Sequence, residues 1–324
     1  MSFVPLEHKA AGHDGAMQSL DGSLFIKPTN AQELQFYTST QAEAQNIDDQ
    51  IELGSKLFHW MPVFYGTMSP GVSKELHEKN PEASKGYQDL RVSQPDSGQQ
   101  YLVLENVVYG FKKPSVIDLK LGNILYDENA SIDKVERMKK VSNTTTSGSL
   151  HYRICGMKIV DSGKSLTNIK GSDLRETARK DDGYLLFDKN FGKGLTSDTV
   201  KDALLLFFRG NDLSPQRQAI VLQNTIRRLQ LLYNCLLEYE IRMISASLLL
   251  VYENDEGRWE ELGNQDILVN EMEIDEDSSE EDAPRALSLL KLIDFAHTKY
   301  TPGKGNDESI LTGIQNLLEL IQTV

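Results

Sequence analysis

Cysteine and long apolar stretches are scarce in this chain of 324 residues. Its two cysteines, Cys155 and Cys235, lie far apart and fit no metal-ligand spacing, which argues against a disulfide framework and a zinc module. The longest apolar runs, such as residues 248–251, are far shorter than the roughly 20 residues that cross a bilayer. Residues 1–25 show no basic start followed by an apolar core. We therefore expect no membrane span, no secretory signal and a protein that works inside the cell.

Common nucleotide-binding signatures are also absent. The chain has no Gly-x-x-x-x-Gly-Lys-Ser/Thr segment, whose backbone N–H groups surround phosphates in P-loop enzymes. It has neither a Gly-x-Gly-x-x-Gly segment nor a His-Arg-Asp triplet. The first absence excludes the P-loop class. The other two mean that the chain is not a protein kinase by its sequence motifs.

Positive charge is in the minority, with 34 Lys+Arg against 48 Asp+Glu, so the net charge is −14. This balance argues against direct nucleic-acid binding by the protein as a whole. Eight acids and no base fall within residues 271–282, and the rest of the chain carries −6. Such a block repels itself and buries nothing, so we expect a disordered insertion at about 268–285. An acidic interaction patch is the alternative.

Residues 112–158 have the opposite balance, with nine bases against five acids. A local basic field in an acidic molecule attracts a small polyanion to one place. The alternative is an ordinary solvated helix face. Part of this stretch, from Ser131 to Val141, predicts a helix with Ser131 as its N-cap. On this helix Lys134 and Arg137 share one side.

The remaining pattern predicts two lobes. Residues 1–108 would form a small N-terminal lobe and hinge, and residues 109–324 a larger C-terminal lobe, with a crossing strand at 101–108 and a variable loop at 66–100. The other expected elements are helices at 31–44 after Asn30, at 215–239 after Ser214 and from residue 311, with buried strands at 245–252 and 289–295.

Charged side chains at strand ends suggest phosphoryl transfer. Asp118 and Lys120 are two residues apart and would share one face of a strand. Asp294 ends an apolar strand and would hold Mg²⁺, while Lys27 ends an earlier strand and would bind nucleotide phosphates. Asp118 would face the acceptor hydroxyl, and residues 105–107 the base. The alternatives are a structural cap or ion pair for Asp294 and a surface lysine for Lys27.

Six segments together resemble the inositol polyphosphate kinases, and among them most closely the fungal multikinases. The segments are LEHKAAGHDG at 6–15, FIKPTNAQELQFY at 25–37, YLVLENVVYGFKKPSVIDLKLG at 101–122, TTTSGSLHYRICGMK at 144–158, SASLLLVYE at 245–253 and LIDFAHTKYTPGKGNDE at 292–308. They follow the order of the family and are spread along nearly the whole chain, from residue 6 to residue 308.

The resemblance implies an α+β fold of two lobes, similar to that of protein kinases, with ATP and Mg²⁺ between them. It implies that Asp118 and Lys120 are catalytic and that Glu33 pairs with Lys27. The implied ATP-binding residues are Lys27, Glu105, Val107, Asp118 and Asp294, of which Asp294 also holds the metal. The implied substrate-binding residues are Lys120, Lys134, Arg137, Lys140 and His297.

The implied activity is phosphorylation of inositol 1,4,5-trisphosphate at the 6- and 3-hydroxyls, which gives the tetrakis- and pentakisphosphates. An inositol hexakisphosphate kinase is the alternative among enzymes. The acidic segment lies where fungal relatives carry an aspartate-rich insertion, which implies a second role with MADS-box transcription factors. A non-catalytic transcriptional scaffold is thus the other alternative. We expect a location in the nucleus and cytoplasm.

Overall fold

The computed structural model describes six stretches of the chain, namely residues 3–6, 15–45, 52–69, 99–163, 174–269 and 286–324. Most of the variable loop predicted at 66–100 and almost all of the acidic insertion lie outside these stretches, so the variable loop and the disorder of the insertion both stay predictions. Most of the motif at 6–15 also lies outside the described stretches.

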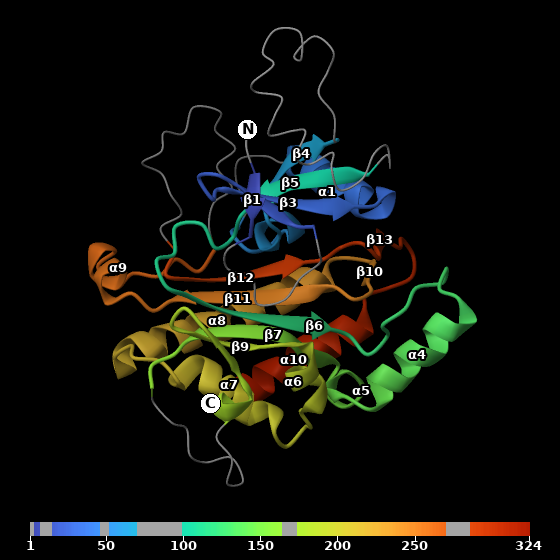
Figure 1. Ribbon diagram of the computed structural model, residues 1–324. Coiled ribbons are helices and arrows are strands. Elements are labelled where there is room, and N and C mark those ends of the chain that lie inside the picture. Colours follow the sequence, from blue (N-terminus) through green and yellow to red (C-terminus); the bar gives the residue numbers. More distant parts are fainter. Residues whose placement is uncertain (1–2, 7–14, 46–51, 70–98, 164–173, 270–285) are drawn as a thin grey trace, which may run out of the picture.

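An antiparallel sheet of five strands forms the upper part of the molecule in Figure 1, in the order β1-β2-β3-β5-β4. Helix α1 (Ala31–Gln45) follows β3 and packs beside this sheet. The predicted N-cap is confirmed, because the Asn30 side chain accepts a hydrogen bond from the Glu33 N–H at 2.8 Å. The strands are β1 (Phe3–Pro5), β2 (Met17–Ser19), β3 (Leu24–Thr29), β4 (Phe64–Met68) and β5 (Gln100–Glu105).

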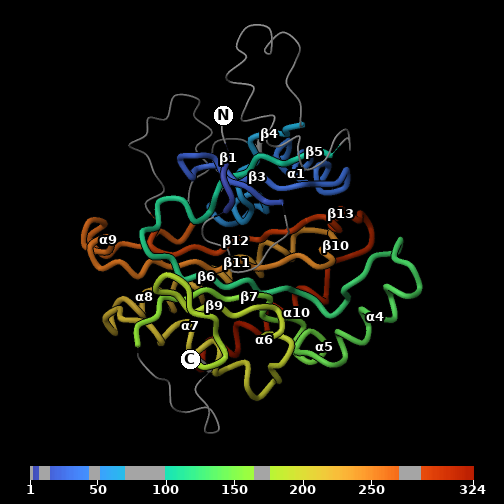
Figure 2. The backbone as a smooth tube through the Cα atoms, in the orientation of Figure 1, coloured from blue at the N-terminus to red at the C-terminus, as the bar shows by residue number. Residues whose placement is uncertain are grey.

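A second antiparallel sheet has six strands in the order β12-β11-β6-β7-β9-β8. Figure 2 shows the chain passing from β5 of the first sheet to β6 of the second. Strand β6 is an interior strand, and Lys120 is its one residue that is not fully buried. Asp118 and Lys120 therefore lie in the middle of the second sheet, between β11 and β7. The strands are β6 (Pro114–Leu121), β7 (Tyr152–Val160), β8 (Arg179–Asp181), β9 (Tyr184–Phe187), β11 (Ser247–Glu253) and β12 (Ser288–Ile293).

Helices cover the face of the second sheet that lies away from the first sheet (Figure 1). The longest is α8, which buries an apolar stripe that includes Leu229, Leu232 and Leu236. Each fully buried leucine contributes roughly 1.5–3 kcal/mol. Within the described residues, no helix has the length and apolar character that a membrane span requires. The helices after α1 are α4 (Ile132–Asn143), α5 (Thr146–Leu150), α6 (Lys189–Gly194), α7 (Val200–Arg209), α8 (Pro215–Leu237), α9 (Glu256–Glu261) and α10 (Glu308–Ile321), with short 3₁₀ turns at Leu57–Trp60 and Leu174–Thr177.

Helix α1 is also tied to a short two-stranded pair, β10 (Ile241–Met243) and β13 (Thr298–Tyr300). The Asn30 side chain donates to the Ala296 carbonyl at 3.0 Å, and the Gln32 side chain donates to the Thr298 carbonyl at 3.2 Å. These bonds hold the turn that follows β12 against the first turn of α1. The two sheets therefore meet where Asp294 lies.

A buried ion pair closes the chain around the acidic segment. Arg228 of α8 lies 3.3 Å from Asp266, and both side chains are almost fully buried. The Asp266 carboxylate also accepts hydrogen bonds from the N–H groups of Leu287 and Ser288, at 3.0 and 2.7 Å. Arg228 in turn donates to the Leu268 carbonyl at 2.7 Å. One cluster thus fixes the chain on both sides of residues 270–285.

The predicted elements are largely confirmed, and the differences lie at their ends. The crossing strand ends at Glu105 rather than at 108, because Asn106 turns the chain and donates to the Gly22 carbonyl at 2.7 Å. The strand predicted at 289–295 ends at Ile293, because Asp294 has a left-handed backbone with φ of 66°. The last helix begins at Glu308, one turn before residue 311, because Asp307 caps it. The predicted lobe boundary at 108/109 lies between β5 and β6.

Candidate active site

Lys27 joins two carboxylates from different parts of the fold. Its Nζ lies 3.0 Å from Glu33 Oε1 in the first turn of α1 and 2.8 Å from Asp294 Oδ1 at the end of β12. Lys27 is 7 % exposed, so the alternative of a surface lysine is wrong, and the predicted pair with Glu33 is present. Burial lowers the pKa of Lys27, but Asp294 and Glu33 outweigh it, and the net pKa lies above its ordinary value.

Glu33 also holds the backbone that carries Asp294. Its Oε1 accepts a hydrogen bond from the Phe295 N–H at 3.1 Å, and its Oε2 accepts one from the Thr29 hydroxyl at 3.0 Å. The left-handed conformation of Asp294 is unfavourable for a residue with a side chain and persists only where its surroundings hold it. Glu33 therefore fixes both the lysine and the aspartate of this cluster.

Asp118 is a buried carboxylate in the middle of β6. It is 6 % exposed, and its Oδ1 has no hydrogen-bond partner among the described residues. Burial and then the negative charge of Asp294 raise the pKa of Asp118 to about 6, against the opposite effect of Lys120. A buried oxygen without a partner is unfavourable, so this site is suited to a cation or a hydroxyl donor from a ligand.

Lys120 and Arg153 stand directly opposite each other on β6 and β7. Residues opposite each other in an antiparallel pair share a face, and residues i and i+2 of a strand do so too. The same face therefore presents Asp118, Lys120 and Arg153. Lys120 Nζ donates to the Ser245 carbonyl at 2.7 Å and makes no ion pair among the described residues.

Arg153 was missed as a site residue at the level of sequence. It is 6 % exposed, its Nε has no partner, and none of the ion pairs of the described residues includes it. Its Nη1 donates a hydrogen bond to the Ser147 hydroxyl at 3.4 Å. Two facing cations that make no ion pair among the described residues indicate an anion site. The signal for Arg153 is the register of β6 with β7, which sequence pattern alone does not supply.

The predicted basic helix is present as α4, capped by Ser131, whose side chain accepts a hydrogen bond from the Lys134 N–H. Arg137 and Lys140 are exposed and Lys134 is half-buried. Within the described residues, no ion pair neutralises these three cations and no hydrogen bond joins them to Asp118 or Asp294. They form a separate group, and Figure 1 shows α4 at the edge of the molecule.

His297 and Asp127 link the end of β12 to the loop before α4. His297 Nδ1 lies 2.5 Å from Asp127 Oδ2. Two residues after His297, in β13, Lys299 Nζ lies 2.5 Å from Glu128 Oε1. The turn that begins at Asp294 is therefore attached to the loop that leads into the basic helix.

The end of β5 and the chain that follows it contain the predicted adenine-binding residues. The N–H of Glu105 donates to the Val63 carbonyl at 2.8 Å, and its side chain accepts from the Val63 N–H at 3.1 Å. The N–H of Val107 donates to no acceptor among the described residues. Val107 thus offers a backbone donor at the point where the chain leaves the first sheet.

The acidic groups fit a divalent cation that is bound together with a nucleotide. No group of three His, Cys, Asp or Glu side chains that could hold a metal alone occurs in the described part of the chain. Mg²⁺ is usually held by one or two carboxylates together with substrate phosphates. Asp294 and the unpartnered oxygen of Asp118 supply such carboxylates, beside the phosphate-binding candidate Lys27.

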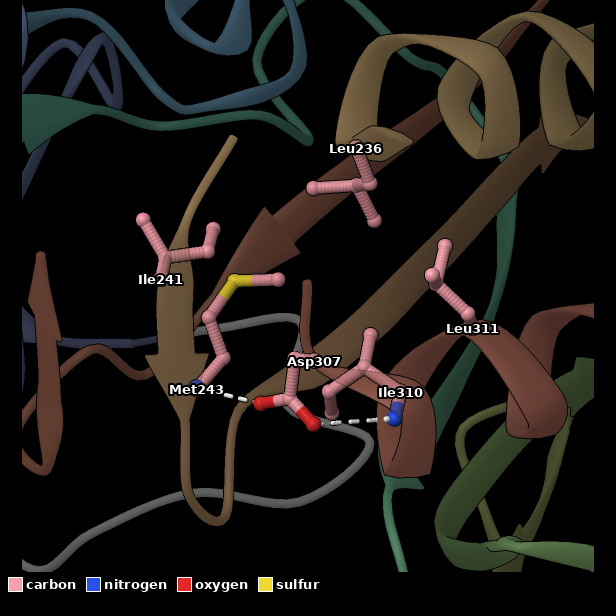
Figure 3. A pocket seen from close by; sticks show the side chains of 6 residues that line it. All are labelled: Leu236, Ile241, Met243, Asp307, Ile310 and Leu311. Carbon is pink, nitrogen blue, oxygen red and sulfur yellow. Dashed lines mark hydrogen bonds between the residues drawn. The ribbon is translucent and has the colours of Figure 1, made fainter. Parts of the chain in front are cut away.

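A small pocket elsewhere has no such chemistry. It lies between α8, β10 and α10, and five of its six lining residues are apolar, as Figure 3 shows. Its one acid is Asp307, whose carboxylate accepts hydrogen bonds from the N–H groups of Met243 and Ile310, at 2.9 and 3.3 Å. The space leaves no room for a water molecule. The candidate site is therefore the charged region around Asp118.

Comparison with known proteins identifies the family of the chain. The family model described as inositol polyphosphate kinase matches residues 101–322. Over 98% of this chain and 98% of its own length, the inositol polyphosphate multikinase of Saccharomyces cerevisiae is 40% identical. The multikinase of Schizosaccharomyces pombe is 29% identical over 96% of this chain and 93% of its own length. A crystal structure of the S. cerevisiae multikinase with ADP and Mn²⁺ covers 93% of this chain and 99% of its own, with a TM-score of 0.71 and 39% identity. The α+β, kinase-like fold of two lobes is confirmed.

Proposed function

Since the chain belongs to the inositol polyphosphate kinase family, we propose that it is an ATP- and Mg²⁺-dependent multikinase. It phosphorylates inositol 1,4,5-trisphosphate at the 6- and 3-hydroxyls, and the products are the tetrakis- and pentakisphosphates. The names of the two relatives, both multikinases, favour this activity over that of a hexakisphosphate kinase.

The observation that supports the proposal is the buried, unpartnered oxygen of Asp118. The negative charge of Asp294 raises the pKa of Asp118, and the positive charges of Lys120 and Arg153 lower it. A phosphoryl donor and a polyanionic acceptor need this combination, with a carboxylate at the reacting hydroxyl and cations for both sets of phosphates.

Each side of the site has its own task. Lys27 binds the phosphates of ATP, and backbone groups of Glu105 and Val107 contact adenine. Asp294 holds Mg²⁺, which neutralises charge on the transferring phosphoryl group. The phosphates of the inositol bind to Lys120 and Arg153 in the interior and to the cations of α4 at the edge. These α4 residues are Lys134, Arg137 and Lys140.

Transfer then requires little covalent help from the protein. The ring hydroxyl oxygen attacks the γ-phosphorus, the bond from that phosphorus to the bridging oxygen breaks, and ADP leaves. In a loose transition state the hydroxyl loses its proton late, so Asp118 mainly orients the hydroxyl and accepts the proton at the end. Lys120 stabilises the charge that develops on the transferring oxygens.

The test is product analysis with Mg-ATP and inositol 1,4,5-trisphosphate, with Asp294→Ala beside the natural chain. We expect conversion through tetrakis- to pentakisphosphate, and none in the variant. Arrest at the tetrakisphosphate would contradict the multikinase assignment. Inositol hexakisphosphate is offered in parallel, and its conversion to a pyrophosphate would favour the rival enzyme.

A role with MADS-box transcription factors and a location in the nucleus and cytoplasm stay predictions. The residues on which the first depends lie outside the described part of the chain. Replacement of residues 271–284 by a short Gly-Ser linker separates the roles. Kinase activity should persist, because Asp266 holds the chain on both sides of this segment. Binding of a MADS-box partner to the natural chain, lost in the variant, would support the second role.

A further inference from the structure

Asp127 is held in one orientation by its own loop. Its Oδ1 accepts a hydrogen bond from the Asn129 N–H at 3.0 Å, and its backbone carbonyl accepts one from the Ala130 N–H at 3.2 Å. Its side chain is 17 % exposed. The carboxylate is therefore fixed before any ligand binds, and only Oδ2 is left to point outward from the turn.

That second oxygen meets His297. The distance of 2.5 Å from Oδ2 to Nδ1 means that one nitrogen of the imidazole is occupied by the protein. When a carboxylate accepts the Nδ1 proton of a histidine, it sets both the tautomer and the ring orientation. Nε2 is then the nitrogen that is available to a ligand, and the His297 side chain is partly exposed, at 35 %.

We propose that Asp127 is a positioning residue, which holds His297 so that Nε2 contacts the inositol phosphate. The inference rests on the proposed function and on the substrate-binding role that the family resemblance implies for His297. Asp127 itself does not touch the substrate. Its loop lies between β6, which carries Asp118, and α4, which carries the basic residues, so the dyad occupies the junction of the two groups of charges.

The neighbouring ion pair supplies a matched control. Glu128 and Lys299 connect the same two segments at the same distance, 2.5 Å, but the Glu128 side chain is 68 % exposed and does not meet His297. If the contacts served only to fasten the loop to β13, removal of either pair would have similar effects. If Asp127 acts through the imidazole, only the Asp127 pair should affect the substrate.

The experiment compares Asp127→Asn, His297→Ala, the double variant and Glu128→Gln, with Mg-ATP saturating and inositol 1,4,5-trisphosphate varied. We expect Asp127→Asn to raise KM for the inositol phosphate about tenfold, which is the loss of one hydrogen bond to a charged group, while kcat falls less than about threefold. His297→Ala should have an effect of similar size. The double variant should be no worse than His297→Ala, and Glu128→Gln should change KM less than about twofold.

A second readout reports the dyad without turnover. The ¹⁵N chemical shifts of the His297 ring should show a proton on Nδ1 in the natural chain and a mixture of tautomers in Asp127→Asn, and Asp127→Glu should restore the first pattern in part. Additive losses in the double variant, an equal effect of Glu128→Gln, or unchanged shifts would each overturn the inference. Normal turnover with such a result would leave the proposed function intact, whereas no turnover by the natural chain would remove both.

Discussion

Lys27 Nζ lies 2.8 Å from Asp294 Oδ1, so the lysine and the aspartate neutralise each other in the protein without ligands. The proposed roles separate them, because Lys27 then binds phosphate and Asp294 binds metal. A metal ion alone must compete with a buried ammonium group for the carboxylate. A nucleotide that attracts Lys27 removes this competition, which makes the two ligands cooperative.

We therefore predict that ADP tightens Mn²⁺ binding about tenfold, a typical coupling between linked sites. Lys27→Met should bind Mn²⁺ more tightly than the natural chain in the absence of ADP and should show a weaker coupling, because only the contacts of the metal with the ADP phosphates then remain. Titration calorimetry with and without ADP measures both effects. Lys180→Met, which removes an exposed lysine paired with Asp161, is the control. Equal Mn²⁺ affinity in the natural chain and Lys27→Met, without ADP, would show that the ion pair does not restrain the metal site.

Asp118→Asn should stabilise the protein while it abolishes turnover. The pKa of Asp118 is raised from 3.8 to about 6, so the unfolded chain loses this proton at lower pH than the folded one. The free energy of unfolding therefore falls as the pH rises from about 4 to 6. A shift of this size corresponds to about 3 kcal/mol. Asn, which does not titrate, avoids that loss.

Urea unfolding of the ligand-free protein at several pH values measures the effect. At about pH 3 the two chains should be similar, because this pH lies below both pKa values of Asp118, which is then mostly protonated in the folded and the unfolded natural chain. At pH 7 the variant should be the more stable. A difference that does not vary with pH would mean that the carboxylate is better solvated than the structure indicates.

Arg153→Met should have opposite effects on substrate binding and stability. The variant removes a buried cation that makes no ion pair among the described residues and faces Lys120. We expect the thermal midpoint to rise by about 2 °C, which corresponds to about 1 kcal/mol in a chain of this size. KM for inositol 1,4,5-trisphosphate should rise at least about tenfold. Arg153→Lys keeps the charge, so it should show a smaller change in KM and no gain in stability; a stable variant with unchanged KM would place the anion elsewhere.

The basic helix allows a test with a control on its opposite side. At 100° per residue, Lys134, Arg137 and Lys140 fall within about 120° of the α4 surface, and Lys139 points away from them. Lys134→Ala with Arg137→Ala should raise KM for the inositol phosphate about tenfold and weaken its dependence on salt, with kcat little changed. Lys139→Ala should leave KM within about twofold. An equal effect of Lys139→Ala would indicate attraction by the general field of the helix rather than a defined site.

Local sequence signals predicted the elements well because local contacts determine them. Ser131 and Ser214 cap the helices that follow them, as expected. The ion pair of Lys27 and Glu33, which the family resemblance implied, joins residues six positions apart in the chain. The predicted boundaries were wrong where a single side chain ends an element. The strand β5, for example, stops just before Asn106.

Long-range geometry was beyond these signals. The pairing of Arg153 with Lys120 depends on a strand register with an irregularity between Asp118 and Leu119, which no pattern of residue types encodes. The contact of His297 with Asp127 joins positions 170 residues apart in the sequence. The family resemblance implied that His297 binds the substrate. Its carboxylate partner, Asp127, could be identified only from the structure.

The closure of the chain by Asp266 and Arg228 has a consequence for how such a protein can change over generations. Because the N–H groups of Leu287 and Ser288 and the carbonyl of Leu268 are fixed by this one pair, the number of residues between them is not a condition for folding. In general, doubling the number of residues in a loop costs only about 0.6 kcal/mol in closure entropy. Insertions and deletions at this place are therefore nearly neutral for stability, and new sequence can accumulate there without disturbing catalysis.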